Sequence, residues 1–445
     1  NGKVEKKKKR EIYEEYLETY DLENIISEMT NSVVHSQDPN PIVYMIKYLT
    51  GLLTEDERTE FNINIEPPYP KGVPIVKFPK YKIDNILSKY LTKNNWYNYK
   101  YRKTCYNNDI NKLTYLSDHS NEDKIGIVLV DKDCINTYHD LLDNIIYESH
   151  KLEMEKSLTN TSYKISDSPR LYKDKLFFYD ELKKSLKTLK FIFYRNIEGY
   201  TYNNIDKRNG KLKNIIEEEM KRMKCVDILP DDLKLIETSK MEEFIKNDET
   251  INSEYIWMIN AGFVNKNYTI HERIILVSEK KSLIILINFS NHFELILSSN
   301  FANFDEVVYN FNYVMEILKQ AKVRFTFDTD PKYGYITSNL SFLGGGFKLM
   351  GMFEHKNIKK HEDLLKNINL FHYKFKNEQQ ILFSFFYNFY ENNYCSCINR
   401  SLIELNGVKI FCDNLNKKLN KEKIKLNNKS PITKAYDLSL LKLYN

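Results

Sequence analysis

The C-terminal half of the chain alternates between short apolar stretches and long amphipathic ones. Residues 189–200 (LKFIFYRNIEGY) and 272–299 (ERIILVSEKKSLIILINFSNHFELILSS) are rich in β-branched and aromatic residues, which favour strands, and the EKK triplet predicts a tight turn. Residues 304–321 instead repeat apolar side chains at helical spacing, which predicts a helix. Its inward-facing residues are expected to be Val307, Val308, Phe311, Val314, Met315 and Leu318. Residues 186–425 therefore predict a domain that mixes strands and helices.

Length, charge and cysteine usage restrict the classes of protein to which this chain can belong. A chain of 445 residues is long enough for two or three domains. The formal net charge of +5 does not indicate a nucleic-acid partner, and we interpret the basic run in residues 1–10 as a solvated extension. No apolar run approaches the roughly 20 residues that span a bilayer, and no signal peptide is visible. The six scattered cysteines lack zinc-binding spacing. We therefore expect a reduced, cytoplasmic protein without a metal site.

Residues 11–55 predict two helices joined by a turn. Asn40 and Pro41 suit the N-cap and first position of the second helix, because an N–H missing there costs no hydrogen bond. Both helices carry an apolar stripe that a two-helix hairpin cannot bury alone, so it must pair with itself or with the next domain. The prolines that follow predict an extended linker over residues 56–77.

The segment DPNPIVYMIKYL, residues 38–49, resembles the RIIα-type docking-and-dimerisation domain of cAMP-dependent kinase regulatory subunits. In that family the hairpin forms an antiparallel four-helix dimer, whose face receives an amphipathic helix from a partner. The alternative is an ordinary helical hairpin that caps the main domain. The resemblance implies protein partners, through homo- or heterodimerisation or an amphipathic helix, and an axonemal or cytoskeletal setting in a cilium or flagellum. The implied docking residues are Leu17, Ile25, Ile26, Met29, Ile42, Met45, Ile46 and Leu49.

Residues 332–352 (KYGYITSNLSFLGGGFKLMGM) are similar to the signature segment of the phosphagen kinases, which include the arginine and creatine kinases. Residues 78–104 and 125–151 resemble the small helical domain of the same family. The resemblance implies an α+β fold, with a small all-α domain at residues 78–165 and a large domain at residues 166–425. In the large domain an antiparallel sheet is flanked by helices, and residues 426–445 form a tail. The signature frame is kept at Gly334, Tyr335, Ser341, Leu343, Gly344 and Gly346.

Most of the residues that bind phosphate and carry out catalysis in that family are replaced in this chain. Phosphagen kinases transfer the γ-phosphoryl of ATP to a guanidino nitrogen, with Mg and a cage of arginines around the phosphates. On this resemblance the phosphate-cage positions hold Lys190, Ile192, Glu294 and Lys348. The positions of a glutamate and of the active-site cysteine hold Ser290 and Asn339, whereas Arg273 and His292 are retained. The substrate-closing loop of the family falls near residues 371–377, which contain no arginine and no glycine.

These replacements predict a catalytically inactive scaffold that needs no cofactor. Each lost charge-assisted hydrogen bond removes about 1.5–3 kcal/mol of phosphate binding. A lost catalytic carboxylate costs a factor of about 10²–10⁴ in rate. One alternative is a divergent phosphotransferase that acts on a guanidino metabolite or a protein arginine, with Lys190, Lys348 and Arg273 holding ATP-Mg. Another is a nucleotide sensor without turnover. We interpret the glycine run 344–346 as a tight turn and His292 as a packed residue.

Overall fold

The computed structural model describes residues 16–17, 19–37, 40–53, 57, 60, 78–93, 95–100, 102–150, 171, 176, 178–202, 207–264, 273–280, 282–356, 358–361, 372–386 and 394–419. The chain divides into two compact units, Asn1–Lys77 and Phe78–Asn445. The expected N-terminal extension and C-terminal tail lie outside the described residues, as does nearly all of the expected linker.

The first unit contains the two expected helices, α2 (Leu22–Ser36) and α3 (Pro41–Gly51). Helix α3 begins at proline as the sequence predicts, although the Asn40 side chain makes no capping hydrogen bond. The helices contact each other through polar groups: Ser32 Oγ and Tyr44 Oη lie 2.9 Å apart, and buried Tyr48 donates its hydroxyl to Glu28. The hairpin is therefore held partly by hydrogen bonds between the two helices.

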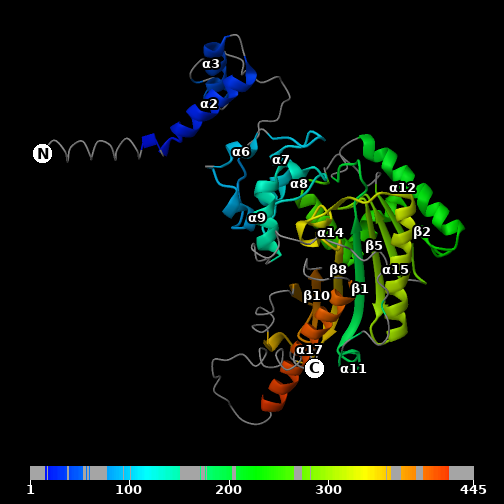
Figure 1. The fold of residues 1–445 in the computed structure, drawn as a ribbon. Coiled ribbons are helices and arrows are strands. Elements are labelled where there is room, and N and C mark those ends of the chain that lie inside the picture. Colours follow the sequence, from blue (N-terminus) through cyan, green and yellow to red (C-terminus); the bar gives the residue numbers. More distant parts are fainter. Residues whose placement is uncertain are drawn as a thin grey trace. The chain divides into compact units, whose positions relative to one another are not determined.

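In its described residues, the second unit is built on one antiparallel sheet of eight strands in the order β2-β3-β4-β5-β1-β8-β10-β9. Strand β1 lies near the middle of this sheet, is the first of these strands in the sequence, and pairs with β5 and β8 (Figure 1). A separate two-stranded sheet joins β6 (Thr329–Asp330) to β7 (Gly334–Tyr335). The sheet strands are β1 (Leu186–Arg195), β2 (Lys234–Leu235), β3 (Ile274–Ser278), β4 (Leu283–Ile287), β5 (Phe293–Asn300), β8 (Phe347–Glu354), β9 (His372–Phe375) and β10 (Gln380–Phe386).

One face of this sheet packs against three long helices. Helices α12 (Lys207–Cys225), α15 (Phe304–Arg324) and α17 (Tyr394–Leu419) contribute apolar side chains to one core with alternate residues of β1. Side chains alternate along a strand, so the remaining residues of β1 point to the other face. The inward face expected for α15 is buried, except that Val308 and Met315 are only half-buried.

Short helices make up the described part of residues 78–150. Hydrogen bonds join this helical region to the signature segment, from the Leu129 N–H to the Ser338 carbonyl (2.9 Å) and between His150 Nε2 and the Leu340 carbonyl (2.8 Å). The helices are α5 (Ile86–Tyr90), α6 (Tyr97–Lys100), α7 (Ile110–His119), α8 (Cys134–Thr137) and α9 (His139–Ser149). The remaining elements are α11 (Tyr179–Leu182), α13 (Thr238–Asn247), α14 (Glu249–Asn260), η3 (Leu340–Phe342) and η4 (Ile358–His361). These helices and the antiparallel sheet confirm the expected α+β class.

Part of the segment expected to be a substrate-closing loop is instead an edge strand. Residues 372–375 form β9, in which Phe375 pairs with Ile381 and Lys374 with Leu382 of β10. This segment lacks glycine and includes β-favouring aromatic residues, which suits backbone pairing better than an open loop. Residue 371 lies outside the described residues.

Among the helices that the structure describes, none combines the length and apolarity that a membrane span requires.

Candidate functional site

The sheet face opposite the core brings together the four phosphate-cage positions. Lys190 and Ile192 alternate along β1 with the core residues of that strand. Glu294 of β5 pairs with Tyr194, and Lys348 of β8 pairs with Ile192. Directly paired residues share a face, so these side chains from three neighbouring strands meet on one surface.

A buried polar cluster occupies this surface, and we call its members Glu254, Ser290, Asn291 and Glu294 the carboxyl cluster. Ser290 Oγ lies 2.6 Å from Glu254 Oε1 and 2.7 Å from Glu294 Oε1. The Asn291 backbone N–H donates to Glu294 Oε1 (2.9 Å), and its side-chain amide donates to Ser290 Oγ (2.9 Å). All four residues are buried, with Glu294 only 1 % exposed. Helix α14 supplies Glu254, so this helix lies against the sheet face at the cluster.

Electrostatics at the cluster oppose an anionic ligand. Burial, followed by the charge of Glu254, raises the pKa of Glu294 to about 8. Burial lowers the pKa of Lys348, while the two carboxyl groups act in the opposite direction. Its Nζ lies 5.4 Å from the centroid of the Phe342 ring. The surface therefore presents two acidic side chains beside positions that the family resemblance assigns to the phosphate cage.

Lys190 is engaged by the first turn of helix α14. Its Nζ donates to Thr250 Oγ1 (2.9 Å) and lies 3.8 Å from an Asp248 carboxylate oxygen. Asp248 also caps the helix, accepting from the Thr250 and Ile251 N–H groups. The Lys190 ammonium group therefore already binds groups of the protein, and buried Ile192 has no polar group to bind phosphate.

Two further lysines bind the same end of α14 from the edge of the sheet. Lys374 of β9 lies 3.7 Å from Glu249, and Lys376 pairs with the same carboxylate. Ion pairs between side chains this exposed contribute at most about 1 kcal/mol each to the free energy of folding. Together with Lys190 they place three cations around the helix N-terminus.

The glycine run 344–346 forms a turn around buried Arg195. The Arg195 guanidinium donates to the carbonyls of Gly345 (3.2 Å) and Gly346 (3.0 Å), and it lies 3.7 Å from the centroid of the Tyr335 ring. The N–H groups of Gly344 and Gly346 donate to backbone carbonyls. A Cβ at Gly346 would lie 2.6 Å from the Tyr194 carbonyl. The glycine run therefore directs its carbonyl groups toward the Arg195 guanidinium. Neither of those two N–H groups is available to bind an anion.

The other predicted site residues make local structural contacts. His292 is fully buried: its Nδ1 accepts from the Ile197 N–H (2.9 Å), which leaves Nε2 to donate to the Thr201 carbonyl (2.8 Å). Burial lowers its pKa to about 4, so the ring is neutral near pH 7. Buried Arg273 donates to the Phe263 carbonyl, and the Asn339 side chain accepts from the Ser341 N–H at the start of η3.

Glu254 is the member of the cluster that no sequence motif marks. It is one of two glutamates in α14, and nothing in the spacing of that helix distinguishes it. Its pairing with Ser290 and Glu294 depends on a packing of helix on sheet that the local sequence does not encode.

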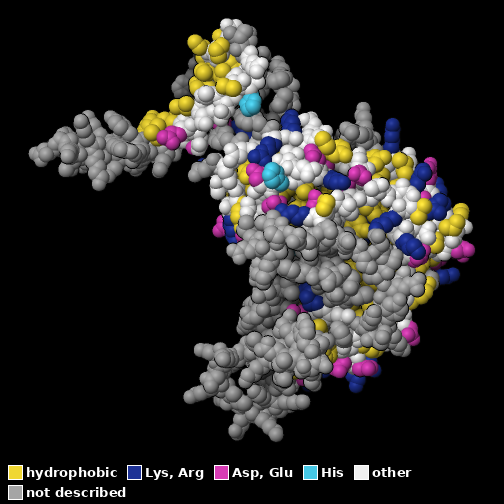
Figure 2. All heavy atoms as spheres, in the orientation of Figure 1, with side chains coloured by type: hydrophobic (Ala, Val, Ile, Leu, Met, Phe, Trp, Pro, Cys, Tyr) yellow, Lys and Arg dark blue, Asp and Glu magenta, His cyan; other side chains and the backbone are white. Residues whose placement is uncertain are grey.

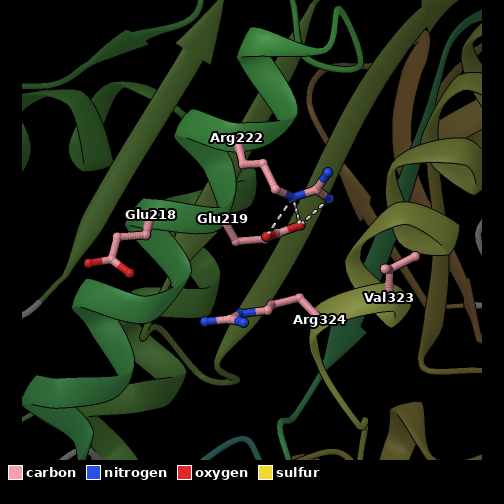
Figure 3. A pocket seen from close by; sticks show the side chains of 5 residues that line it. All are labelled: Glu218, Glu219, Arg222, Val323 and Arg324. Atoms are coloured by element: carbon pink, nitrogen blue, oxygen red, sulfur yellow. Dashed lines mark hydrogen bonds and ion pairs between the residues drawn. The ribbon is translucent and has the colours of Figure 1, made fainter.

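A separate cavity of about 400 Å³ lies between α12 and the end of α15 (Figure 3). Its lining includes Glu219, which is buried and forms an ion pair with Arg222 at 2.5 Å, and the exposed Val323. Both helices pack on the core face, so this cavity is not part of the carboxyl cluster. The lining residues are Glu218, Glu219, Arg222, Val323 and Arg324. Within the described part of the chain, no group of three His, Cys, Asp or Glu residues is arranged to hold a metal ion.

Comparison with known proteins gives a family match and a fold. Residues 212–376 match the family model described as ATP:guanido phosphotransferase, C-terminal catalytic domain. The crystal structure of lombricine kinase is similar at a TM-score of 0.60 and 18 % identity, over 77 % of this chain and 96 % of the kinase. The substrate-free duplicated taurocyamine kinase from Schistosoma mansoni is similar at a TM-score of 0.56 and 14 % identity, over 75 % of this chain and 48 % of that one.

This chain thus matches about half the length of the duplicated enzyme. No curated protein matches it in sequence. The chain has the phosphagen kinase fold, and its residues 212–376 match the catalytic domain of the ATP:guanido phosphotransferase family.

Proposed function

We propose that this protein is a catalytically inactive relative of the phosphagen kinases that serves as a scaffold and docks into a larger assembly. The observation that carries the proposal is the burial of Glu294 against Glu254 on the sheet face. By the family resemblance, Glu294 takes the place of a phosphate-binding arginine. A carboxyl group there removes a bidentate donor and adds repulsion against phosphate.

Helix α14 adds a second obstacle to nucleotide binding. A phosphate that used Lys190 would have to displace its contacts with Asp248 and Thr250. A dissociation constant of 1 mM corresponds to only about 4 kcal/mol of binding free energy. The loss of two or three charge-assisted hydrogen bonds, at about 1.5–3 kcal/mol each, is enough to remove affinity of that size.

Titration with Mg-ATP by calorimetry tests the proposal, with an active arginine kinase as the positive control. We expect no heat of binding up to millimolar nucleotide, because the cationic cage is dismantled. A micromolar dissociation constant would overturn the proposal. The Glu294→Gln variant refines the result: weak binding that appears only in this variant would identify the carboxyl group as the blocking element.

The docking role rests on the hairpin of α2 and α3. Of the eight predicted docking residues, four leave large parts of their side chains exposed, and Figure 2 shows hydrophobic side chains gathered on this unit. These are Ile26 (56 %), Ile42 (72 %), Ile46 (46 %) and Leu49 (43 %). The other four, Leu17, Ile25, Met29 and Met45, are half-buried.

Burial of an exposed Ile or Leu contributes about 1.5–3 kcal/mol, so such a face favours association. The hairpin would dimerise or receive an amphipathic helix. The axonemal or cytoskeletal setting rests on the analogy with RIIα-type hairpins of ciliary and flagellar complexes.

The alternative of a divergent guanidino or protein-arginine phosphotransferase is not favoured. It requires Lys190, Lys348 and Arg273 to hold ATP-Mg. Lys190 contacts α14, and Arg273 is buried with its guanidinium donating to a backbone carbonyl. Lys348 faces the two acids of the carboxyl cluster.

A further inference from the structure

Ser290 Oγ has three close polar contacts, but its single proton can be donated in only one of them. Its Oγ lies 2.6 Å from Glu254 Oε1, 2.7 Å from Glu294 Oε1 and 2.9 Å from the side-chain amide nitrogen of Asn291. A hydroxyl donates one hydrogen bond and accepts two. The amide of Asn291 is a donor, so it takes one lone pair. Ser290 can then donate to only one of the two carboxyl groups.

The second carboxyl group must therefore be protonated, so that it can donate a hydrogen bond to Ser290 Oγ. An ionised carboxylate is only an acceptor, so two of them cannot both lie within hydrogen-bond distance of Ser290 Oγ without repulsion. One carboxylic acid and one carboxylate satisfy every contact, with the acid donating to the remaining lone pair of Ser290. Because both carboxyl groups contact the same hydroxyl, the proton belongs to the pair and not to either residue alone. Burial, followed by the neighbouring Glu254 charge, favours this protonated form and raises the pKa of Glu294 to about 8.

The two carboxyl groups lie at the junction between helix α14 and the sheet. Glu254 comes from α14, whereas Ser290 and Glu294 come from the turn before β5 and from β5 itself. Lys348 of β8 faces both acids, and Tyr194 of β1 is buried beside them. The first turn of α14 is held separately, by Lys190 of β1 and by Lys374 and Lys376 at the sheet edge.

We propose that Glu254 and Glu294 share one proton through Ser290, and that this proton fastens helix α14 to the sheet face. Its loss places a second negative charge in a buried site whose nearby cation is Lys348. The middle of α14 then separates from the sheet, while the lysine contacts retain its first turn. The protein therefore contains a pH-sensitive latch over the sheet face that carries Lys190, Ile192, Glu294 and Lys348.

Tryptophan fluorescence tests the latch directly. The chain has two tryptophans, Trp96 and Trp257, and Trp257 lies on α14 with its indole N–H 3.3 Å from Asp123. A Trp96→Phe background leaves Trp257 as the single reporter. We expect its emission to shift to longer wavelength as the pH rises from neutral to about 9, with a midpoint near 8, which is below the range where ordinary tyrosines ionise.

Variants separate the latch from general alkaline effects. In Glu254→Gln the amide donates to Ser290 as the acid does, so we expect emission that no longer changes over this pH range. Glu243→Gln, which removes an exposed carboxylate from the neighbouring α13, should keep the full transition. A parent protein without the transition, or Glu254→Gln with an unchanged one, would overturn the proposal. If Glu254→Gln fails to fold by circular dichroism, Glu294→Gln carries the same expectation, because it also removes the second charge.

Discussion

At the scale of single residues, the substitution of one charge type by another changes what a surface can bind. Glu294 and Lys348 lie on β5 and β8, the two strands that flank β1, at positions that the family resemblance assigns to the phosphate cage. A lysine offers a point charge without the planar fork of arginine, and a buried carboxyl group repels the ligand. The resemblance to the phosphagen kinases predicts both replacements. The partner of Glu294 was not predictable, because Glu254 lies in a helix whose sequence has no motif.

The buried acid pair should make stability depend on pH. The pKa of Glu294 is about 8 in the folded protein, above its ordinary value near 4.5, so folding takes up a proton. The stabilisation from this group is complete below about pH 4.5 and is lost as the pH rises toward 8. Between pH 6 and 8 we expect the free energy of unfolding to fall by roughly 2 kcal/mol more than in Glu294→Gln, as measured by urea denaturation. Parallel pH profiles for the two proteins would contradict this expectation.

At the scale of elements, helix α14 and the hairpin of α2 and α3 differ in what they contact. Polar groups of α14 bind the sheet and its edge lysines, whereas α2 and α3 bind each other and leave four of the predicted docking residues exposed. Periodicity predicted the two helices α2 and α3, because i, i+3, i+4 spacing and a proline at the start of a helix are local signals. It could not predict β9, where a loop was expected, because strand formation there depends on pairing with β10.

The exposed hairpin face should control association. We expect Ile46→Glu to weaken self-association or partner binding by tenfold or more, because a charge replaces a side chain worth about 1.5–3 kcal/mol when buried. Sedimentation velocity over a concentration series measures the change. Asn31→Glu, which adds the same charge at an exposed polar position of α2, is the matched control and should behave as the parent protein. Equal effects of the two substitutions would argue for a general charge effect.

At the scale of the whole molecule, the alternation of strand-like and helix-like stretches predicted a domain that mixes strands and helices, and the family resemblance made the α+β class the expected one. The order of the strands was beyond the reach of local patterns, because β1 pairs with strands much later in the sequence. The family resemblance supplied the antiparallel sheet. The position of the carboxyl cluster required the three-dimensional packing of α14 on that sheet.

The two compact units should also be separable. Removal of residues 1–77 should leave the melting temperature of residues 78–445 within about 2 °C of the full chain, because each unit has its own internal contacts. Differential scanning calorimetry of the two proteins measures this. The concentration-dependent association that we propose for the full chain should be absent from the shortened protein. A fall of several degrees would show that the hairpin contributes to the stability of the larger unit.

The central position of β1 has a consequence for biosynthesis. This strand leaves the ribosome before either of its neighbours, since β5 begins at Phe293 and β8 only at Phe347. Until those residues are translated, its backbone groups have no partner strand and Leu189, Phe191 and Phe193 have no sheet neighbours to cover them. Pairings so distant in sequence slow folding and leave apolar strands open to aggregation. The nascent chain therefore depends on protection of β1 until synthesis has passed Glu354, where β8 ends.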